Sequence, residues 1–236
     1  MKIFVKTGSR AKKEKFGKRL HRSFYTRPTL RVAKELLGKY IVRPIRKSGK
    51  VSFLQGKIVE VEAYIGPKDK ASHAYRGKIT SRNKAEYLIG GHVYIYLVYG
   101  MYWQLNIVTG LADKPECVLI RAVEPIFNIA KNSKSKTLNP PANKVPLCGD
   151  KQIRNFKIQN SKNLTDGPGK LCRWLKLDKS FYGEDLTTSK RIWLEGREEK
   201  IDSKMIKSGP RIGIDYAGPY WSRRKWRFIV KNNECK

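Results

Sequence analysis

The segment from Gly90 to Val108, GGHVYIYLVYGMYWQLNIV, constrains the fold more than any other part of the chain. In VYIYLVY, apolar side chains alternate with Tyr94 and Tyr96, which is typical of a strand that packs one face on a core. Gly100 allows the chain to turn, and MYWQLNIV indicates the return strand. The segment therefore predicts a β-hairpin with two tyrosines on the face away from the core.

The same hairpin places Tyr99 near its tip, next to Gly100. An aromatic side chain at an exposed tip of a nucleic-acid-binding protein can act as a wedge between stacked bases. It can equally fold back as a core or dimer contact. The spacing of the residues does not distinguish the two interpretations.

The rest of the chain predicts a mixed α+β domain without repeats. A helix is expected after Pro28, because Leu30, Ala33 and Leu37 share one face and Gly38 follows as a stop signal. A second short helix is expected at 169–177, after an Asp-Gly-Pro sequence. Further strands are expected at 40–46, 51–64, 117–123, 191–194, 211–214 and 226–230, the first two joined by the turn KSGK.

The net charge of +31 and the pI of about 10.1 indicate a polyanionic partner, with nucleic acid as the leading candidate. The charge is uneven, since the first 50 residues carry 17 basic and 2 acidic side chains and residues 51–125 carry 9 and 7. The nearly neutral middle is where we expect the core and a specific site. Residues 1–22 are interpreted as a basic extension and residues 127–165 as a surface insertion. Both are expected to add nonspecific DNA affinity.

The cysteines and histidines give no sign of a metal centre or another cofactor. Neither the four cysteines nor the three histidines show paired ligand spacing, and the zinc deaminase, Walker A and dinucleotide-binding patterns are absent. The N-terminal sequence is too polar for a signal peptide or membrane anchor. We therefore expect a protein without metal or cofactor that is not secreted, in a bacterial cytoplasm or, in a eukaryote, a nucleus.

A second informative segment is IVEVEAYIGPKDKASHAYRG, residues 58–77. Glu60, Glu62 and Tyr64 alternate along a predicted strand and share one face, with Val59 and Val61 on the other. A carboxylate on an otherwise apolar strand is a candidate general base, since burial raises its pKa towards the working pH. The pattern alone favours the simpler reading, in which one glutamate pairs with an arginine and serves the structure.

Several separate motifs together resemble the alkyladenine or 3-methyladenine DNA glycosylases that lack a helix-hairpin-helix. They are IVEVEAYIGPKDKASHAYRG, TSRN, VYIYLVYGMYWQLN, VLIRAVEP, DGPGKLC and RIGIDYAG. The resemblance implies a single domain at 23–236 with a curved, largely antiparallel sheet, flanking helices and a protruding hairpin that inserts into DNA. It also implies a monomeric enzyme that excises alkylated and deaminated purines, including 3-methyladenine, 7-methylguanine, hypoxanthine and ethenoadenine, from double-stranded DNA.

The resemblance assigns the chemistry to Glu62 and Arg121. Glu62 lies in the match to the family's E-A-Y motif and would activate water against C1′ of the flipped nucleotide. Arg121, in VLIRAVEP, would help to hold that water. No lysine occupies the positions matched to the family's active site, so we expect a monofunctional enzyme that leaves an abasic site without nicking the strand.

The resemblance also implies a set of residues that hold the base. Tyr64 and Tyr96 would sandwich it, and His73 would contact it from the side of Tyr64. Asn106 would clash with the exocyclic amine of normal guanine, and Tyr99 would fill the hole left in the duplex. The hairpin would then be both plug and pocket wall.

The sequence departs from the family pattern in places. The family's T-P-R-N reads TSRN here, the usual Met-Phe that follows is Glu86-Tyr87, and AGPYWSRRKWRF lacks the usual acidic residue and Lys-Pro pair. These changes leave lesion preference open. Two other function classes also remain: a noncatalytic RNA- or tRNA-binding module of related fold, and a saccharide hydrolase using Glu60 and Glu62.

Overall fold

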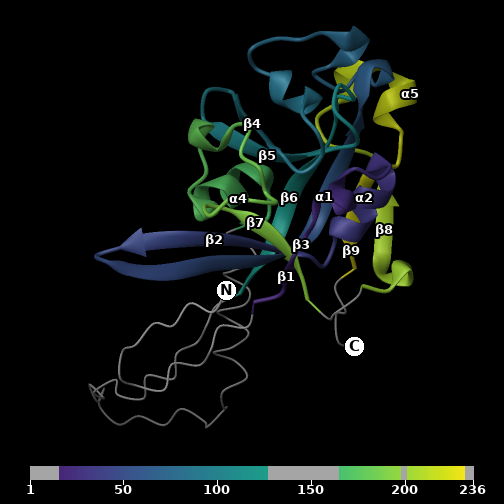
Figure 1. The fold of residues 1–236 in the computed structure, drawn as a ribbon. Coiled ribbons are helices and arrows are strands. Elements are labelled where there is room, and N and C mark those ends of the chain that lie inside the picture. Colours follow the sequence, from purple (N-terminus) through teal and green to yellow (C-terminus); the bar gives the residue numbers. More distant parts are fainter. Residues whose placement is uncertain (1–15, 127–164, 198–200, 232–236) are drawn as a thin grey trace, which may run out of the picture.

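A nine-stranded antiparallel sheet organises the computed structural model, which describes residues 16–126, 165–197 and 201–231 (Figure 1). The strand order is β1-β7-β2-β3-β6-β5-β4, and β9 pairs with both β3 and β8. The strands are β1 (Lys18–Arg19), β2 (Tyr40–Lys47), β3 (Lys50–Ile65), β4 (Val93–Val98), β5 (Tyr102–Thr109), β6 (Glu116–Ile126), β7 (Trp193–Gly196), β8 (Ile206–Gly209) and β9 (Arg227–Val230). The fold is thus the expected α+β class with a largely antiparallel sheet.

The helices in the described part of the chain are few and short. The α-helices are α1 (Arg22–Tyr25), α2 (Thr29–Leu36), α4 (Pro168–Leu175) and α5 (Pro219–Ser222). The 3-10 turns are η1 (Gly66–Lys68), η2 (Tyr75–Gly77), η3 (Lys84–Tyr87), η4 (Lys179–Phe181), η5 (Ser203–Met205) and η6 (Asp215–Ala217). Every helix in the described ranges is too short or too polar to span a membrane.

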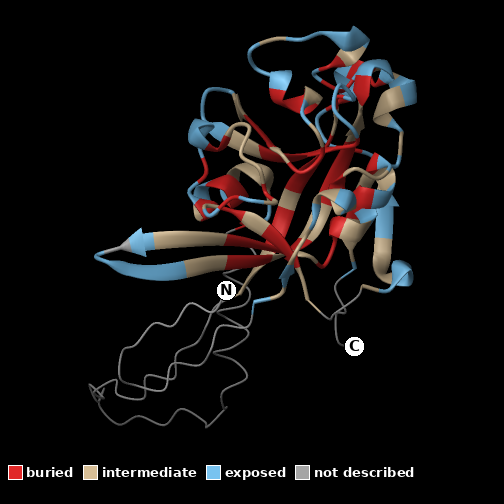
Figure 2. Ribbon diagram, in the orientation of Figure 1, coloured by how far each residue is buried: buried red, intermediate tan, exposed pale blue. Residues whose placement is uncertain are grey.

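Helices α2 and α4 pack on the same face of the sheet, where their apolar side chains join one hydrophobic core (Figure 2). Alternation along β3 and β4 supplies this face, since Val61, Ala63 and Ile95 belong to the core while their neighbours do not. The opposite face is left for polar and aromatic side chains. Because one face of the sheet is apolar and the other is mixed, apolar side chains recur at every second position along these strands.

The pairing of β3 with β6 contains two register shifts, between Ile58 and Glu60 and between Glu60 and Val61. The first leaves Val59 without a direct partner, and the second does the same for Arg121 on β6. As a result, Ile58 rather than Val59 shares the core face with Val61. The expectation of unbroken alternation through Val59 is therefore wrong, because the bulge changes the face to which the side chains point.

Two hairpins depend on positive φ angles. Ser48 and Gly49 (φ 48° and 74°) form the two-residue turn between β2 and β3, whose tip projects from the body of the molecule (Figure 1). Tyr99 and Gly100 (φ 51° and 67°) turn the chain between β4 and β5. The expected hairpin over the segment rich in tyrosine is confirmed.

Other expectations differ from the structure at particular residues. The strand expected at 211–214 is a loop, because the side chain of Arg211 turns inward and Gly213 has a φ of 73°. Lys18–Arg19, inside the expected extension 1–22, pairs with β7 at the sheet edge. Residues 1–15 and nearly all of the insertion expected at 127–165 lie outside the described residues.

Candidate active site

Four cross-strand neighbours form a row on the sheet face opposite the helices. Glu62 on β3 pairs with Leu119 on β6, Leu119 pairs with Asn106 on β5, and Asn106 pairs with Tyr94 on β4. Three strand spacings of about 4.8 Å separate the ends of this row, so it is roughly 14 Å long. Glu62 and Tyr94 therefore lie at opposite ends of one floor.

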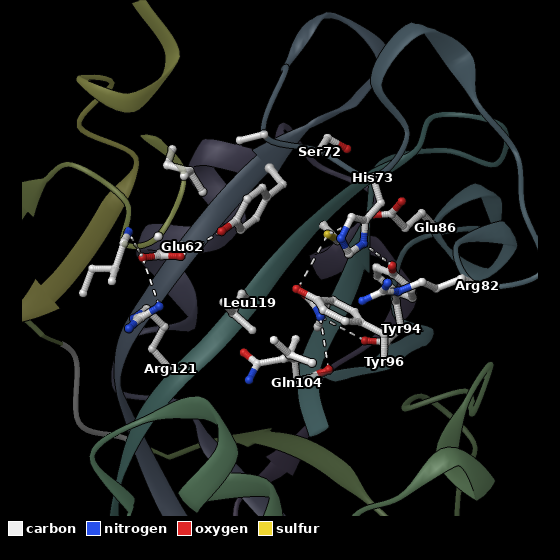
Figure 3. Close-up of a pocket in the computed structure, with 18 of the residues that line it drawn as sticks. Glu62, Ser72, His73, Arg82, Glu86, Tyr94, Tyr96, Gln104, Leu119 and Arg121 are labelled. Carbon is white, nitrogen blue, oxygen red and sulfur yellow. Dashed lines mark hydrogen bonds and ion pairs between the residues drawn. The ribbon is translucent and has the colours of Figure 1, made fainter. Parts of the chain in front are cut away.

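A cavity of about 450 Å³ lies above this floor (Figure 3). Its walls come from the loop around Ser72, from the β4–β5 hairpin and from the loop that begins at Ile212. All the site residues that the resemblance implies line it, namely Glu62, Tyr64, His73, Tyr96, Tyr99, Asn106 and Arg121, whereas Glu60 does not. The volume is in the range of a small-molecule pocket.

Glu62 is fully buried at one end of the cavity and receives three polar contacts. The Tyr64 hydroxyl donates to Oε2 at 2.9 Å, and the backbone N–H of Ile212 donates to Oε1 at 2.9 Å. Arg121 Nη1 lies 3.2 Å from the same Oε1. Burial raises the pKa of Glu62, while these donors, Arg121 first, oppose the shift. A carboxylate that is both desolvated and oriented is suited to accept a proton.

Arg121 contacts both strand glutamates from the bulge on β6. Its Nε donates to Glu60 Oε1 at 3.0 Å while its Nη1 faces Glu62. Arg227 on β9 also reaches Glu60, at 3.3 Å. Glu60 is therefore the structurally paired carboxylate, and it fixes the guanidinium that faces Glu62.

A buried ion pair holds the loop that supplies the Ile212 N–H. Arg211 and Asp69 have fully buried side chains, and Nη2 lies 2.9 Å from Oδ1. Arg211 also donates to the carbonyl of Ala63 at 3.0 Å, one residue from Glu62. The Asp69–Arg211 pair thus ties together the strand end, the following loop and the wall residue Ile212.

Tyr64 and Tyr96 are half-buried rings on the two sides of the cavity, from β3 and β4. Each lies next to a guanidinium: Arg211 is 4.6 Å from the centroid of Tyr64, and Arg82 is 4.9 Å from that of Tyr96. Burial raises the pKa of both hydroxyls, so both rings stay neutral. Neutral aromatic faces are suitable for stacking on a planar base.

His73 contacts the β4 side of the cavity. Its Nδ1 lies 2.6 Å from the Tyr94 hydroxyl, and its ring lies 4.6 Å from that of Tyr96. The resemblance had implied the side of Tyr64 instead; the hydrogen bond to Tyr94 explains the observed orientation. Desolvation and the nearby Arg82 lower the pKa of His73 to about 4, so its imidazole is neutral at pH 7.

Asn106 is buried in the floor with a fixed orientation. Its Nδ2 donates to the carbonyls of Tyr94 and Gln104, each at 3.2 Å. Its Oδ1 lies 3.8 Å from the Cys117 sulfur. The two hydrogen bonds from Nδ2 fix the carboxamide, so Asn106 presents a rigid surface to any ligand.

Sequence reasoning missed several residues that line the cavity or, like Asp69 and Arg211, hold its wall in place. Asp69 and Arg211 are separated by 142 positions, and no local pattern relates them. Glu86 stood out only as a departure from the family pattern, whereas the structure buries it against Cys117. Tyr94 could have been found, since it shares the alternating face with Tyr96. Within the described ranges, no three His, Cys, Asp or Glu side chains are placed to hold a metal ion.

Comparison with known proteins gives a consistent family. A family model described as methylpurine-DNA glycosylase matches residues 23–234. A Clostridium novyi protein named "Putative 3-methyladenine DNA glycosylase" is 44% identical over 92% of this chain and 97% of its own length. Proteins of the same name from Clostridium perfringens strain SM101 and Methanocella arvoryzae are 42% and 41% identical over 92% of this chain, and over 97% and 94% of their own lengths.

Proposed function

Because the chain belongs to the methylpurine-DNA glycosylase family, we propose that it removes damaged purines from duplex DNA. The substrates are alkylated and deaminated purines of the 3-methyladenine, 7-methylguanine, hypoxanthine and ethenoadenine type. The observation that carries the proposal is Glu62, a fully buried carboxylate with three donors at one end of a cavity lined by Tyr64 and Tyr96.

The proposed reaction is hydrolysis of the N-glycosidic bond of a flipped nucleotide. Glu62 accepts a proton from a water molecule while the water oxygen bonds to C1′, and the C1′–N bond breaks with its electron pair leaving on the base. The carboxylate also stabilises the positive charge that develops on the sugar. The group at the reacting end is a carboxylate and not an amine, so we infer that the product is an abasic site in an unbroken strand.

Selection of damaged purines would begin in the cavity. Stacking on an aromatic side chain is worth about 1–3 kcal/mol per base, and a cationic alkylated base gains further cation–π attraction. Tyr64 on β3 and Tyr96 on β4 lie on opposite sides of the floor, which supports this role. The rigid Asn106 would exclude the exocyclic amine of guanine. Damaged bases also cost less to unstack than intact ones.

Tyr99 is proposed as the plug that replaces the flipped nucleotide. Its side chain is 86% exposed, and its φ of 51° is unfavourable for a residue other than glycine. Packing does not compensate this strain, so contact with a duplex is the better explanation for a tyrosine at the tip. The ring would fill the gap in the base stack and slow the return of the flipped base.

Replacing Tyr99 with alanine is expected to weaken binding to a duplex with one hypoxanthine by about 10- to 100-fold, the range for one lost base-stacking interaction. Tyr99→Phe keeps the ring and should bind within a few-fold of the native protein. Fluorescence anisotropy with a labelled duplex measures both constants. Equal affinity of the alanine and native proteins would show that Tyr99 is not the plug.

The test of the proposed function is product analysis on duplexes that contain hypoxanthine or 7-methylguanine. The native protein is expected to release the free base and to leave a strand that breaks only after hot alkali. Strand cleavage without alkali would exclude a purely hydrolytic enzyme. Tight binding without release from any damaged duplex would favour a nucleic-acid-binding module.

A further inference from the structure

Glu86 is a second buried carboxyl group at the cavity, and the chemistry above does not use it. It lies on η3, is 1% exposed and lines the end of the cavity nearer Tyr94, away from Glu62 (Figure 3). The Cys117 thiol donates to Oε1 at 3.4 Å. Oε2 is buried and has no hydrogen-bond partner among the described residues. A buried polar atom without a partner is costly, so it indicates a site for a ligand atom.

The groups around Glu86 provide no compensating positive charge. Within the described ranges Glu86 forms no ion pair, and the guanidinium of Arg82, which also lines the cavity, lies over the ring of Tyr96. Burial raises the pKa of Glu86 to about 8, against a smaller opposing effect of the Cys117 thiol. The nearby Asn83 amide donates through Nδ2 to the carbonyls of His73 and Lys78, so Oε2 stays without a partner among the residues described. At pH 7 Glu86 is therefore a neutral carboxylic acid with one O–H to donate. The titratable groups that face it are Cys117 on β6, Tyr94 and Tyr96 on β4, Tyr87 on η3, and Tyr182.

We propose that protonated Glu86 donates a hydrogen bond to an acceptor atom of the bound base and thereby determines specificity for neutral deaminated purines. This inference rests on the proposed function, because it assumes that Glu62 faces the sugar. The base would then extend along the floor, with its far edge at Glu86. Hypoxanthine offers N7 and O6 as acceptors there, as guanine does.

The two lesion classes should depend differently on this donor. In 7-methylguanine, N7 carries a methyl group and the ring is cationic, so it gains less from a donor at that edge. Ionised Glu86 would repel the acceptor atoms of hypoxanthine, but it would attract a cationic ring. The ratio of hypoxanthine to 7-methylguanine release is therefore the quantity that reports on Glu86.

The experiment measures single-turnover release of both bases between pH 6 and 9.5. In the native protein, release of hypoxanthine relative to 7-methylguanine is expected to fall as the pH rises through about 8. Glu86→Gln keeps a donor that does not titrate, so its ratio should no longer fall. Glu86→Met removes the donor and should lower the ratio about tenfold at pH 7, as expected for one hydrogen bond at a buried site.

Controls separate this role from a structural one. Glu35→Gln changes a half-exposed carboxylate on α2 that does not line the cavity, and it should leave the ratio and its pH dependence as in the native protein. Equal slowing of both lesions by Glu86→Met, or an unchanged alkaline fall in Glu86→Gln, would overturn the inference while the glycosylase function stands. Failure of the native protein to release either base would overturn both. Thermal unfolding of each variant shows whether it is folded.

Discussion

Glu62→Gln is expected to lower the single-turnover rate of hypoxanthine release by about 10³-fold, within the range for loss of a general base. The amide is isosteric with the carboxylate, but it neither accepts the proton from water nor stabilises positive charge on the sugar. Because Glu62 is buried below the cavity wall, binding of the damaged duplex should change little. Rapid-quench measurement with protein in excess separates release from binding.

The matched control for Glu62 is Glu60→Gln. Glu60 lies two positions away and contacts the same guanidinium, but its partners are Arg121 and Arg227 and it does not line the cavity. Its loss should slow release about tenfold or less, through a less fixed Arg121. Equal losses of rate in Glu60→Gln and Glu62→Gln would show that Glu62 is not the general base.

The rate of the native protein should fall as the pH is lowered through the raised pKa of Glu62, since protonation removes the base. Single-turnover rates measured across this pH range test the prediction, and a rate that stays constant on the acid side would contradict it.

Arg211→Met is expected to lower the free energy of unfolding by about 3–5 kcal/mol, the range for breaking a buried ion pair from one side. The change leaves the fully buried Asp69 carboxylate without its bidentate partner. It also frees the loop that presents the Ile212 N–H to Glu62. Urea denaturation followed by tryptophan fluorescence measures the change.

The control for Arg211 is Lys170→Met, which breaks an ion pair with Asp166 on the surface. Both side chains of that pair are more than half exposed, so its loss should cost less than about 1 kcal/mol. Similar losses in the two variants would mean that the Asp69–Arg211 pair contributes no more than a surface pair.

Local patterns predicted much of the fold, because they report which face of an element is buried. Alternation in VYIYLVY and the Gly100 turn gave the β4–β5 hairpin, and the face with Tyr96 does line the cavity. The segment at 211–214 failed for the same reason, since its apolar residues resemble a strand. Arg211 is buried there by Asp69, a long-range partner that composition does not reveal.

The site could be predicted only as far as its residues repeat a family motif. The register shifts that let Arg121 reach both Glu60 and Glu62 depend on the pairing between β3 and β6. No local pattern in the sequence reveals that register. The protonation state of Glu86 likewise depends on desolvation by neighbouring residues from other elements. The family motif predicted the roles of the site residues, whereas the distances between them and the protonation state of Glu86 depend on how the elements pack.

The most direct test of the proposed function is a crystal structure of Glu62→Gln bound to a duplex with one hypoxanthine. The hypoxanthine is expected to lie between Tyr64 and Tyr96, with C1′ next to the residue 62 carboxamide and the Tyr99 ring in the gap left in the duplex. A hypoxanthine that remains stacked and paired in the duplex, with the cavity facing away from the DNA, would contradict it.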